Sequence, residues 1–287
     1  MSLPPEPPKL IPLAYHDPAF MESVSARPLR ILAEYLDPLM RLRRAGVGDT
    51  IVMFGSARII SREDATARLK LLERGARGQA AGTQKSTEGE LRMARAAVEM
   101  SRYYEEAREL ARRITEWSMT LGENPGRFVV CSGGGPGIME AANRGATEAG
   151  GKSIGLNIEL PHEQSPNTYI SSELSFNFHY FFMRKLWFAQ LAKALIVFPG
   201  GFGTLDELAE MLTLLQTKKV SGTNLVLIYG RRYWDEVVNW KAMVNWGMIN
   251  EAEYGMLQFA DTVDEAFERV RAGLEKNHMK VDLDWMS

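Results

Sequence analysis

Short runs of apolar residues alternate with helix-like segments along most of the chain. Buried-strand patterns occur at residues 50–54, 127–131, 152–161, 194–198 and 224–230. Segments that are predicted to be helical alternate with these runs. This alternation is typical of βαβ units, in which consecutive strands are parallel. We therefore expect an α/β protein with one doubly wound parallel sheet.

The helix-like segments differ in how clearly they are amphipathic. Residues 101–119 place apolar side chains along one stripe of a helix, and residues 262–276 predict a last amphipathic helix. Residues 177–194 are strongly aromatic and are predicted to be helical. Residues 231–249 are rich in Trp and predict one further helix.

The N-terminal part of the chain has another character. A Pro-rich arm covers residues 1 to about 20, and a helix interrupted or kinked at Pro38 follows it. We expect residues 1–45 to form this arm and helix, and residues 46–287 to form one nucleotide-binding domain. Within that domain, residues 61–98 are charged, with a stretch rich in Gly, Gln, Ser and Thr, and predict an exposed, partly disordered insertion.

Composition narrows the choice of partners. The formal net charge is −2, so no overall basic field favours nucleic acid, and any anion bound at a glycine turn should be small. The single cysteine, Cys131, and the four histidines show no metal-ligand spacing, so no metal is expected. The N-terminus lacks a signal pattern, and no apolar run is long enough to cross a bilayer. We expect a cytoplasmic protein with no membrane association.

Glycine turns follow three of the predicted strands. "FGSAR" ends the first at residues 54–58, "SGGGPG" follows the second, and "PGGFGT" follows the strand at residues 194–198. Loops after the carboxyl ends of parallel strands share one edge of the sheet, where ligands bind. A glycine turn at a helix N-terminus offers free N–H groups that suit a phosphate.

Neither long glycine turn matches a standard nucleotide motif. Walker A requires Gly-Lys-Ser/Thr, which follows neither turn. The dinucleotide pattern G-x-G-x-x-G fails in "GGGPGI", where Ile138 occupies the sixth position, and it fails again in "GFGTLD". A mononucleotide phosphate remains compatible with both turns, and so does a purely structural tight turn.

Two charged residues allow a structural or a functional interpretation. Thr204 and Glu207 have the spacing of a capping box, in which Glu207 does nothing beyond helix capping. Arg184 could pair with an acidic neighbour on a helix surface. If each residue is considered alone, the structural interpretation is favoured: a helix cap for Glu207 and a surface ion pair for Arg184.

Several motifs together resemble one protein family. They are "MRK" at residues 183–185, "PGGFGTLDE" at 199–207, "GGGPGIMEAAN" at 133–143 and "FGSAR" at 54–58. This combination resembles the larger bacterial members of the LOG family, the cytokinin riboside 5′-monophosphate phosphoribohydrolases, long labelled "possible lysine decarboxylase". The resemblance implies a Rossmann-like fold and a homodimer or larger homo-oligomer.

The resemblance also implies roles for individual residues. Arg184 and Glu207 occupy the family's catalytic positions, and its phosphate cradle corresponds to Gly200, Gly201, Gly203 and Thr204. We expect Glu207, in the first turn of its helix, either to stabilise the positive charge that develops on the ribose or to act as a base or orienting acceptor for the attacking water. The helix dipole should favour its ionised form. Arg184 should stabilise the negative charge that gathers on the departing base.

Further candidates carry weaker signals. Lys185 could add charge for the phosphate or could face solvent. A second set could contact the ribose or the base, although turn formation, core packing or a solvated helix face explain these residues as readily. That set comprises Ser56, Arg58, Gly134, Gly135, Met139, Glu140 and Asn143.

The expected activity is hydrolysis of the N-glycosidic bond of a nucleoside 5′-monophosphate, such as AMP or a cytokinin riboside monophosphate, to free base and ribose 5-phosphate. The alternative is a non-catalytic sensor or carrier that binds the nucleotide without turnover. Lysine decarboxylation would require pyridoxal phosphate on a Schiff-base lysine, and no stretch of the sequence supports one. No cofactor is therefore expected, and the partner is a small-molecule nucleotide.

Overall fold

The computed structural model describes residues 11–76, 87–122, 126–160, 165–220 and 225–279. The expected N-terminal arm and the middle of the predicted insertion lie partly outside these ranges. The described helices and strands have the following bounds: η1 Ala14–His16, α1 Pro18–Glu22, α2 Arg27–Arg44, β1 Thr50–Phe54, α3 Arg62–Ala76, α4 Glu88–Met100, α5 Arg102–Met119, β2 Val129–Ser132, α6 Ile138–Glu148, β3 Ser153–Ile158, η2 Ser172–Leu174, β4 Ser175–Phe178, α7 Phe181–Leu191, β5 Ala192–Val197, α8 Phe202–Gln216, β6 Leu225–Tyr229, α9 Arg231–Val237, α10 Trp240–Asn245, α11 Glu251–Tyr254, β7 Leu257–Ala260 and α12 Val263–His278.

The described strands form one seven-stranded sheet in the order β4-β3-β2-β1-β5-β6-β7, and each neighbouring pair is parallel. The chain starts in the middle of the sheet at β1 and builds outward to β4. It then returns to the other side of β1 with β5. The predicted doubly wound α/β fold is confirmed, and its topological switch point lies between β1 and β5.

Side-chain alternation along β1 explains why helices cover both faces of the sheet. Val52 and Phe54 belong to one core cluster, together with apolar side chains of α7 and α8. Ile51 and Met53 belong to a second cluster, together with those of α5, α6 and α12. Successive residues of a strand point to opposite faces, so a strand buried on both faces is continuously apolar.

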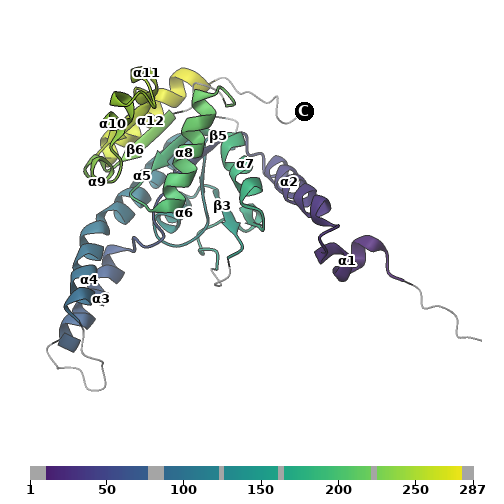
Figure 1. Ribbon diagram of the computed structural model, residues 1–287, viewed down its shortest axis with the longest axis horizontal. Coiled ribbons are helices and arrows are strands. Elements are labelled where there is room, and N and C mark those ends of the chain that lie inside the picture. The colour runs from purple at the N-terminus through teal and green to yellow at the C-terminus, as the bar shows by residue number, and fades with distance from the viewer. Residues whose placement is uncertain (1–10, 77–86, 123–125, 161–164, 221–224, 280–287) are drawn as a thin grey trace, which may run out of the picture.

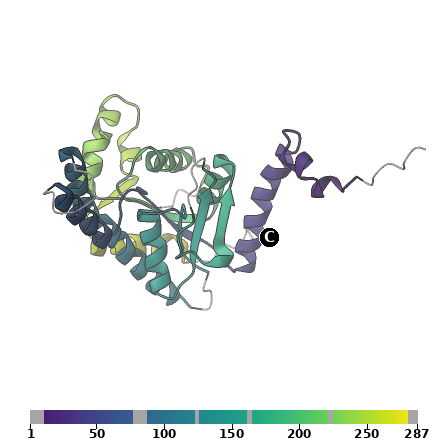
Figure 2. The ribbon, with the colours of Figure 1, turned by 90° about the horizontal axis from the view of Figure 1, so that it is seen from below.

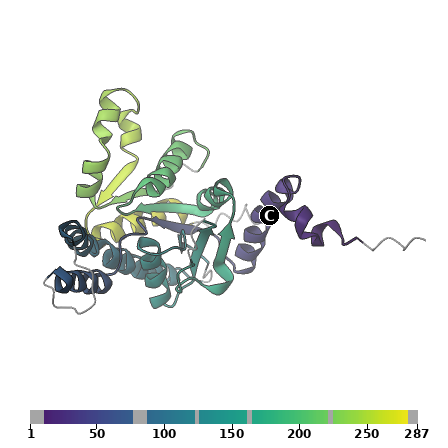
Figure 3. The same ribbon diagram turned by 60° about the horizontal axis from the view of Figure 1, so that its bottom comes forward.

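Helix α2 and helices α9 to α11 lie near opposite ends of the sheet (Figure 1). Helix α2 lies beside α7, near the β4 edge of the sheet (Figure 2). Helices α9, α10 and α11, which connect β6 to β7, lie at the opposite end of the sheet, as Figure 3 shows. Helices α3 and α4 pack side by side and extend away from the sheet, so the described parts of residues 61–98 are mainly helical.

Three local predictions were wrong. Strands β4 and β7 were not expected, and the first residues of the aromatic segment 177–194 belong to β4 rather than to a helix. The Trp-rich segment 231–249 forms two helices, α9 and α10, which are separated at Val238 and Asn239. No helix among the described residues combines the length and the apolar character that a membrane span requires.

Candidate active site

Hydrogen bonds between backbone groups join the three glycine-containing loops at the switch point. The Ser56 N–H donates to the Pro199 carbonyl at 3.0 Å, and the Ile138 N–H donates to the Ser56 carbonyl at 3.2 Å. Gly137 makes this approach possible, because its φ is +71° and a Cβ there would collide with the Ser56 carbonyl oxygen. The loops after β1, β2 and β5 therefore form one connected edge.

A cavity of about 310 Å³ opens at this edge. Its walls come from the loops after β1, β2 and β5, from strand β3, and from the N-terminal parts of α7 and α8. The lining residues are Phe54, Gly55, Ser56, Ala57, Arg58, Gly133, Gly135, Met139, Asn157, Ile158, Leu160, Phe181, Arg184, Gly201, Gly203, Thr204 and Glu207. Sequence motifs that are far apart along the chain thus line one cavity.

Arg184 and Glu207 form a largely buried ion pair in the cavity wall. Arg184 Nη2 donates to Glu207 Oε1 at 3.1 Å, and the two side chains are 14% and 7% exposed. The Arg184 guanidinium also lies over the rings of Phe181 and Phe188, at 5.3 and 5.6 Å from their centroids. Packing on two aromatic rings limits the positions that the guanidinium can adopt.

Burial dominates the electrostatics of this pair. Burial raises the pKa of the Glu207 carboxyl to about 7, although Arg184 and Lys185 act to lower it. Burial likewise lowers the pKa of the Arg184 guanidinium, and Glu207 acts in the opposite direction. The pKa of Glu207 therefore rises although the residue lies near the N-terminus of α8. A carboxyl with this pKa can accept a proton near neutral pH.

Helix α8 begins earlier than the capping-box interpretation requires. Gly201 is its N-cap residue and Phe202 its first residue, and its first turn contains no acidic side chain. Glu207 lies in the second turn, too far along to cap the helix. The predicted capping box is therefore wrong, and so is the placement of Glu207 in the first turn.

The N-terminus of α8 forms an open wall of the cavity. A Cβ atom built on Gly201 or on Gly203 would meet no heavy atom within 4 Å. The first N–H groups of an α-helix lack intrahelical acceptors, and the helix dipole favours an anion beside them. Thr204 adds a hydroxyl to the same wall. This geometry suits the approach of a phosphate to the backbone.

Gly200 has a different environment. A Cβ at Gly200 would collide with the Thr204 side chain, and the Gly200 carbonyl accepts a hydrogen bond from the Tyr233 hydroxyl at 2.8 Å. Gly200 is absent from the described lining of the cavity. The structure therefore accounts for this glycine by the packing of the turn.

Lys185 is also absent from the described lining of the cavity. Its ammonium group pairs with Asp206 at 2.7 Å and with Glu210 at 3.1 Å, on the helix that carries Glu207. Burial is the largest single effect and lowers the pKa of Lys185, but its hydrogen bonds to Asp206 and Glu210 and the charges of nearby carboxylates together outweigh it, so the pKa is raised. Lys185 joins α7 to α8 beside the Arg184–Glu207 pair.

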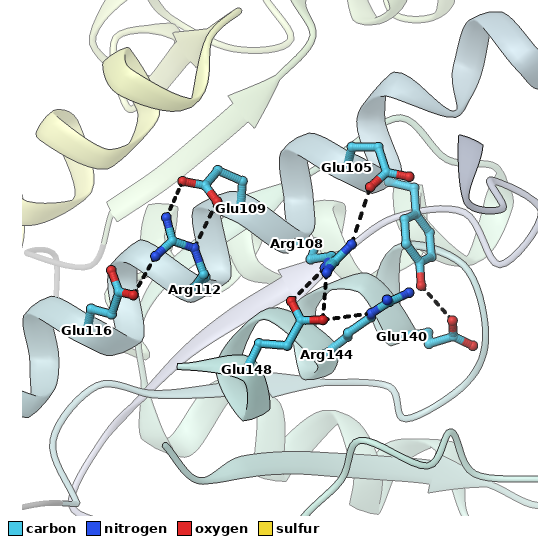
Figure 4. A network of polar contacts seen from close by, with 9 residues as sticks. Glu105, Arg108, Glu109, Arg112, Glu116, Glu140, Arg144 and Glu148 are labelled. Carbon is cyan, nitrogen blue, oxygen red and sulfur yellow. Dashed lines mark hydrogen bonds and ion pairs between the residues drawn. The ribbon is translucent and has the colours of Figure 1, made fainter. Parts of the chain in front are cut away.

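The side chains of two candidate residues on α6 form hydrogen bonds with other parts of the fold. Asn143 is fully buried; it accepts a hydrogen bond from Ser132 Oγ and donates to Ser153 Oγ, both at 2.6 Å. Glu140 accepts from the Tyr104 hydroxyl at 2.6 Å and lies at the edge of a network between α5 and α6 (Figure 4). Neither residue is among the described lining residues, and nor is Gly134.

Ser56, Arg58, Gly135 and Met139 do line the cavity. Arg58 is exposed and has no ion-pair partner among the described residues, so its charge is free to meet an anion.

Asn157 on β3 is a lining residue that sequence reasoning missed. Its Nδ2 donates to the Phe176 carbonyl at 3.0 Å, which fixes the orientation of the amide. The available signal was a polar residue inside the apolar run "SIGLNI". Cys131, in contrast, is buried in the core, and burial raises the pKa of its thiol well above the usual range.

The fold and the cavity define a doubly wound α/β protein with a ligand-sized site at its switch point. The model of the family described as "Possible lysine decarboxylase" matches residues 139–270, which include Arg184 and Glu207. Over these residues, slightly less than half of the chain, the sequence is similar to the family that its motifs resemble. No curated protein matches the chain.

Among solved structures, the molybdenum cofactor binding protein from the phototrophic bacterium Rippkaea orientalis is 19% identical, with a TM-score of 0.40. That comparison covers 58% of this chain and 87% of the other. The Moco carrier protein from Chlamydomonas reinhardtii is 19% identical, with a TM-score of 0.43, and the comparison covers 79% and 98%. These similarities are too low to transfer a ligand or an activity.

The family's printed name raises the question of pyridoxal phosphate. Decarboxylases of that kind hold the cofactor on a lysine. None of the described residues that line the cavity is a lysine, and the adjacent Lys185 is paired with two carboxylates. The residues present do not fit this cofactor. The described residues also contain no cluster of His, Cys, Asp and Glu that could hold a metal ion.

Proposed function

We propose that this protein hydrolyses the N-glycosidic bond of a nucleoside 5′-monophosphate, giving a free base and ribose 5-phosphate. The observation that carries the proposal is the buried Arg184–Glu207 pair, held at 3.1 Å in a cavity that also contains the open N-terminus of α8. A site that only binds a nucleotide needs a phosphate cradle, but it does not need a buried carboxyl with a pKa near 7.

The proposed reaction breaks the bond between C1′ and the base nitrogen, and the bonding electrons leave with the base. Positive charge develops on the ribose, as in other glycoside hydrolyses. Glu207 in its ionised form stabilises this charge and accepts a proton from the water that attacks C1′. Arg184 stabilises the negative charge on the departing base, which then takes a proton from solvent.

Gly201, Gly203 and Thr204 are proposed to hold the 5′-phosphate, and Arg58 to approach it from the loop after β1. A fixed phosphate positions the ribose, which can lower the barrier by several kcal/mol. Met139 and Asn157 are proposed to contact the ribose or the base. These assignments are supported by the fact that all of these residues line the same cavity.

The purified protein should be incubated with AMP, GMP, CMP and isopentenyladenosine monophosphate, and free base and ribose 5-phosphate separated by chromatography. Release by wild type and Arg112→Ala, but not by Arg184→Ala, would support the proposal. Arg112→Ala is a matched control, because it removes an arginine that is paired with Glu109 and Glu116 of its own helix, outside the described cavity lining. Nucleotide binding without release by any variant would instead indicate the sensor or carrier.

We also propose that the protein acts as a cytoplasmic homodimer or larger homo-oligomer. Support comes from large apolar side chains exposed around the start of α7 and α8: Phe181 at 50%, Phe182 at 49% and Phe202 at 92%. Light scattering on the purified protein measures the assembly directly.

A further inference from the structure

Glu34 of helix α2 forms hydrogen bonds to the helix that carries Arg184 and to its N-cap. The Glu34 carboxylate accepts hydrogen bonds from the His179 N–H at 2.7 Å and the Tyr180 N–H at 3.2 Å. Tyr180 is the N-cap residue of α7, and no side chain of α7 itself caps that end. A carboxylate at this position satisfies free N–H groups and complements the helix dipole.

A second contact uses the backbone of the same residue. The Glu34 carbonyl accepts a hydrogen bond from the indole Nε1 of Trp187 at 3.1 Å. This carbonyl is free because Pro38, four residues further on, has no N–H to donate, although α2 continues through it. The proline that was expected to interrupt the helix thus supplies an acceptor for α7.

The contacts of Glu34 with Tyr180 and with Trp187 lie on either side of Arg184 along α7. Tyr180 lies one turn before Arg184 and Trp187 lies one turn after it, so each is on the adjacent turn of the helix. Aromatic packing accompanies both contacts: the Tyr35 and Trp187 rings lie 5.7 Å apart, and the Arg27 guanidinium lies 5.6 Å from the Tyr180 ring centroid. Figure 1 shows α2 and α7 side by side.

We propose that Glu34 is a positioning residue for Arg184: through its carboxylate and its carbonyl it fixes α7 so that the guanidinium reaches Glu207. The proposal deepens the proposed function and rests on it for its kinetic readout. It assigns the N-terminal helix a role in the reaction without any contact with the substrate.

The test compares Glu34→Ala, Glu34→Gln and Asp37→Ala. Asp37 is a matched control, because it is an exposed acid one turn along α2 whose described partner is Arg41 of the same helix. Glu34→Ala should lower kcat roughly 10- to 100-fold, the effect of a small misplacement of a catalytic group, with little change in KM. Glu34→Gln keeps one acceptor oxygen and should restore part of this loss, and Asp37→Ala should behave as wild type.

A second measurement does not depend on turnover. A double-mutant cycle of Arg184→Ala and Glu207→Gln, followed by chemical unfolding, gives the coupling between the two side chains. This coupling should fall by about half or more in the Glu34→Ala background and should stay unchanged in the Asp37→Ala background. If wild type hydrolyses no nucleotide, the proposed function fails, and the coupling alone decides the role of Glu34.

Pro38→Ala provides an independent variant that keeps the carboxylate. Its new N–H competes with Trp187 for the Glu34 carbonyl, so kcat should fall while α2 itself becomes more stable. If Glu34→Ala does not fold, Glu34→Gln and Pro38→Ala carry the test. Unchanged kcat together with unchanged coupling in the folded variants would overturn the proposal.

Discussion

The cavity pair Arg184–Glu207 and the network between α5 and α6 contain the same functional groups in different surroundings. In the network, Arg108 binds Glu148 and Arg112 binds Glu109, and these side chains are 31–44% exposed (Figure 4). In the cavity, the side chains are 14% and 7% exposed. Solvent access is therefore the main difference between two otherwise similar sets of arginine–carboxylate contacts.

The pKa values of the carboxyl groups respond in opposite directions. Partial burial raises the pKa of Glu148, but hydrogen bonds from Arg108 and Arg144 outweigh it, and the net change is downward. For Glu207, burial outweighs the charges of Arg184 and Lys185, and the pKa rises to about 7. These two cations do not compensate for the loss of water around the buried carboxylate. The carboxyl of Glu148 therefore stays ionised at neutral pH, whereas that of Glu207 exchanges a proton near neutral pH.

The largest expected effect concerns turnover. Glu207→Gln should lower kcat for nucleotide hydrolysis by about 100-fold or more, because an amide cannot accept the proton of the attacking water. Glu148→Gln removes a carboxylate of the surface network and should leave kcat unchanged. Steady-state kinetics on both variants measure the difference. If Glu207→Gln is as active as wild type, the Glu207 carboxyl has no role in turnover.

The second effect is a pH dependence of stability with opposite signs in the two regions. Glu207 has a pKa of about 7 when folded and an ordinary value of 4.5. As the pH rises from about 4.5 to 7, the unfolded chain loses this proton before the folded one, so the free energy of unfolding falls. Relative to Glu207→Gln, wild type should lose about 3 kcal/mol across this window in urea titrations.

Glu148→Gln is the control for this titration. The pKa of Glu148 is lowered in the folded state, so its contribution is present above the ordinary value of 4.5 and is lost as the pH falls through the folded-state pKa. Relative to this variant, wild type should lose stability on the acid side only. The same slope for both variants would show that burial does not separate the two regions.

A third experiment changes the free space in the cavity rather than the charge of a side chain. Gly203→Ala adds a methyl group in the open wall of the cavity, where it meets no protein atom. It should weaken nucleotide binding by about tenfold while stabilising α8 by about 0.5–1 kcal/mol, since Ala favours a helix. Calorimetry and thermal unfolding measure the two quantities. Undiminished affinity would place the phosphate elsewhere.

Gly137→Ala is the contrasting substitution. It places a Cβ against the Ser56 carbonyl at a φ of +71°, so it should destabilise the protein by more than about 1 kcal/mol.

The smallest effect is expected in the network itself. Arg112→Ala removes contacts to Glu109 and Glu116, all of them between partly exposed side chains. The free energy of unfolding should fall by less than about 1 kcal/mol, and by less still at 1 M salt, where screening weakens surface pairs. A loss as large as that of a buried pair would mean that the network acts cooperatively.

The centre of the fold could be predicted from the sequence, because β1, β2, β5 and β6 are apolar on both faces and are followed by clear turns. The edge strands β4 and β7 have four residues each, of which only two are buried. Such short, half-exposed strands leave too weak a pattern. The grouping of the glycine turns followed from a general property of parallel sheets, whose loops after the strand ends share one edge.

The chemistry of the site was less accessible to sequence reasoning. No local pattern shows that a charged residue is buried, so Arg184 and Glu207 were selected through the family resemblance and their pKa values were not foreseen. Lys185 and Asn143 show the same limit, because their partners Glu210 and Ser153 become neighbours only through packing. Pro38 was recognised as a helix breaker, yet the acceptor that it frees depends on a helix far along the chain.

The position of β1 in the sheet has a consequence for the synthesis of the protein. Residues 50–54 are made before the other strands of the sheet, and one of their two neighbouring strands, β5, comprises residues 192–197. The nascent chain must therefore hold an unpaired edge on β1 while all the residues between β1 and β5 are made, and such edges favour aggregation. The cavity also stays incomplete until β5 and α8 have joined, so a ligand of this cavity cannot assist the earlier stages of folding.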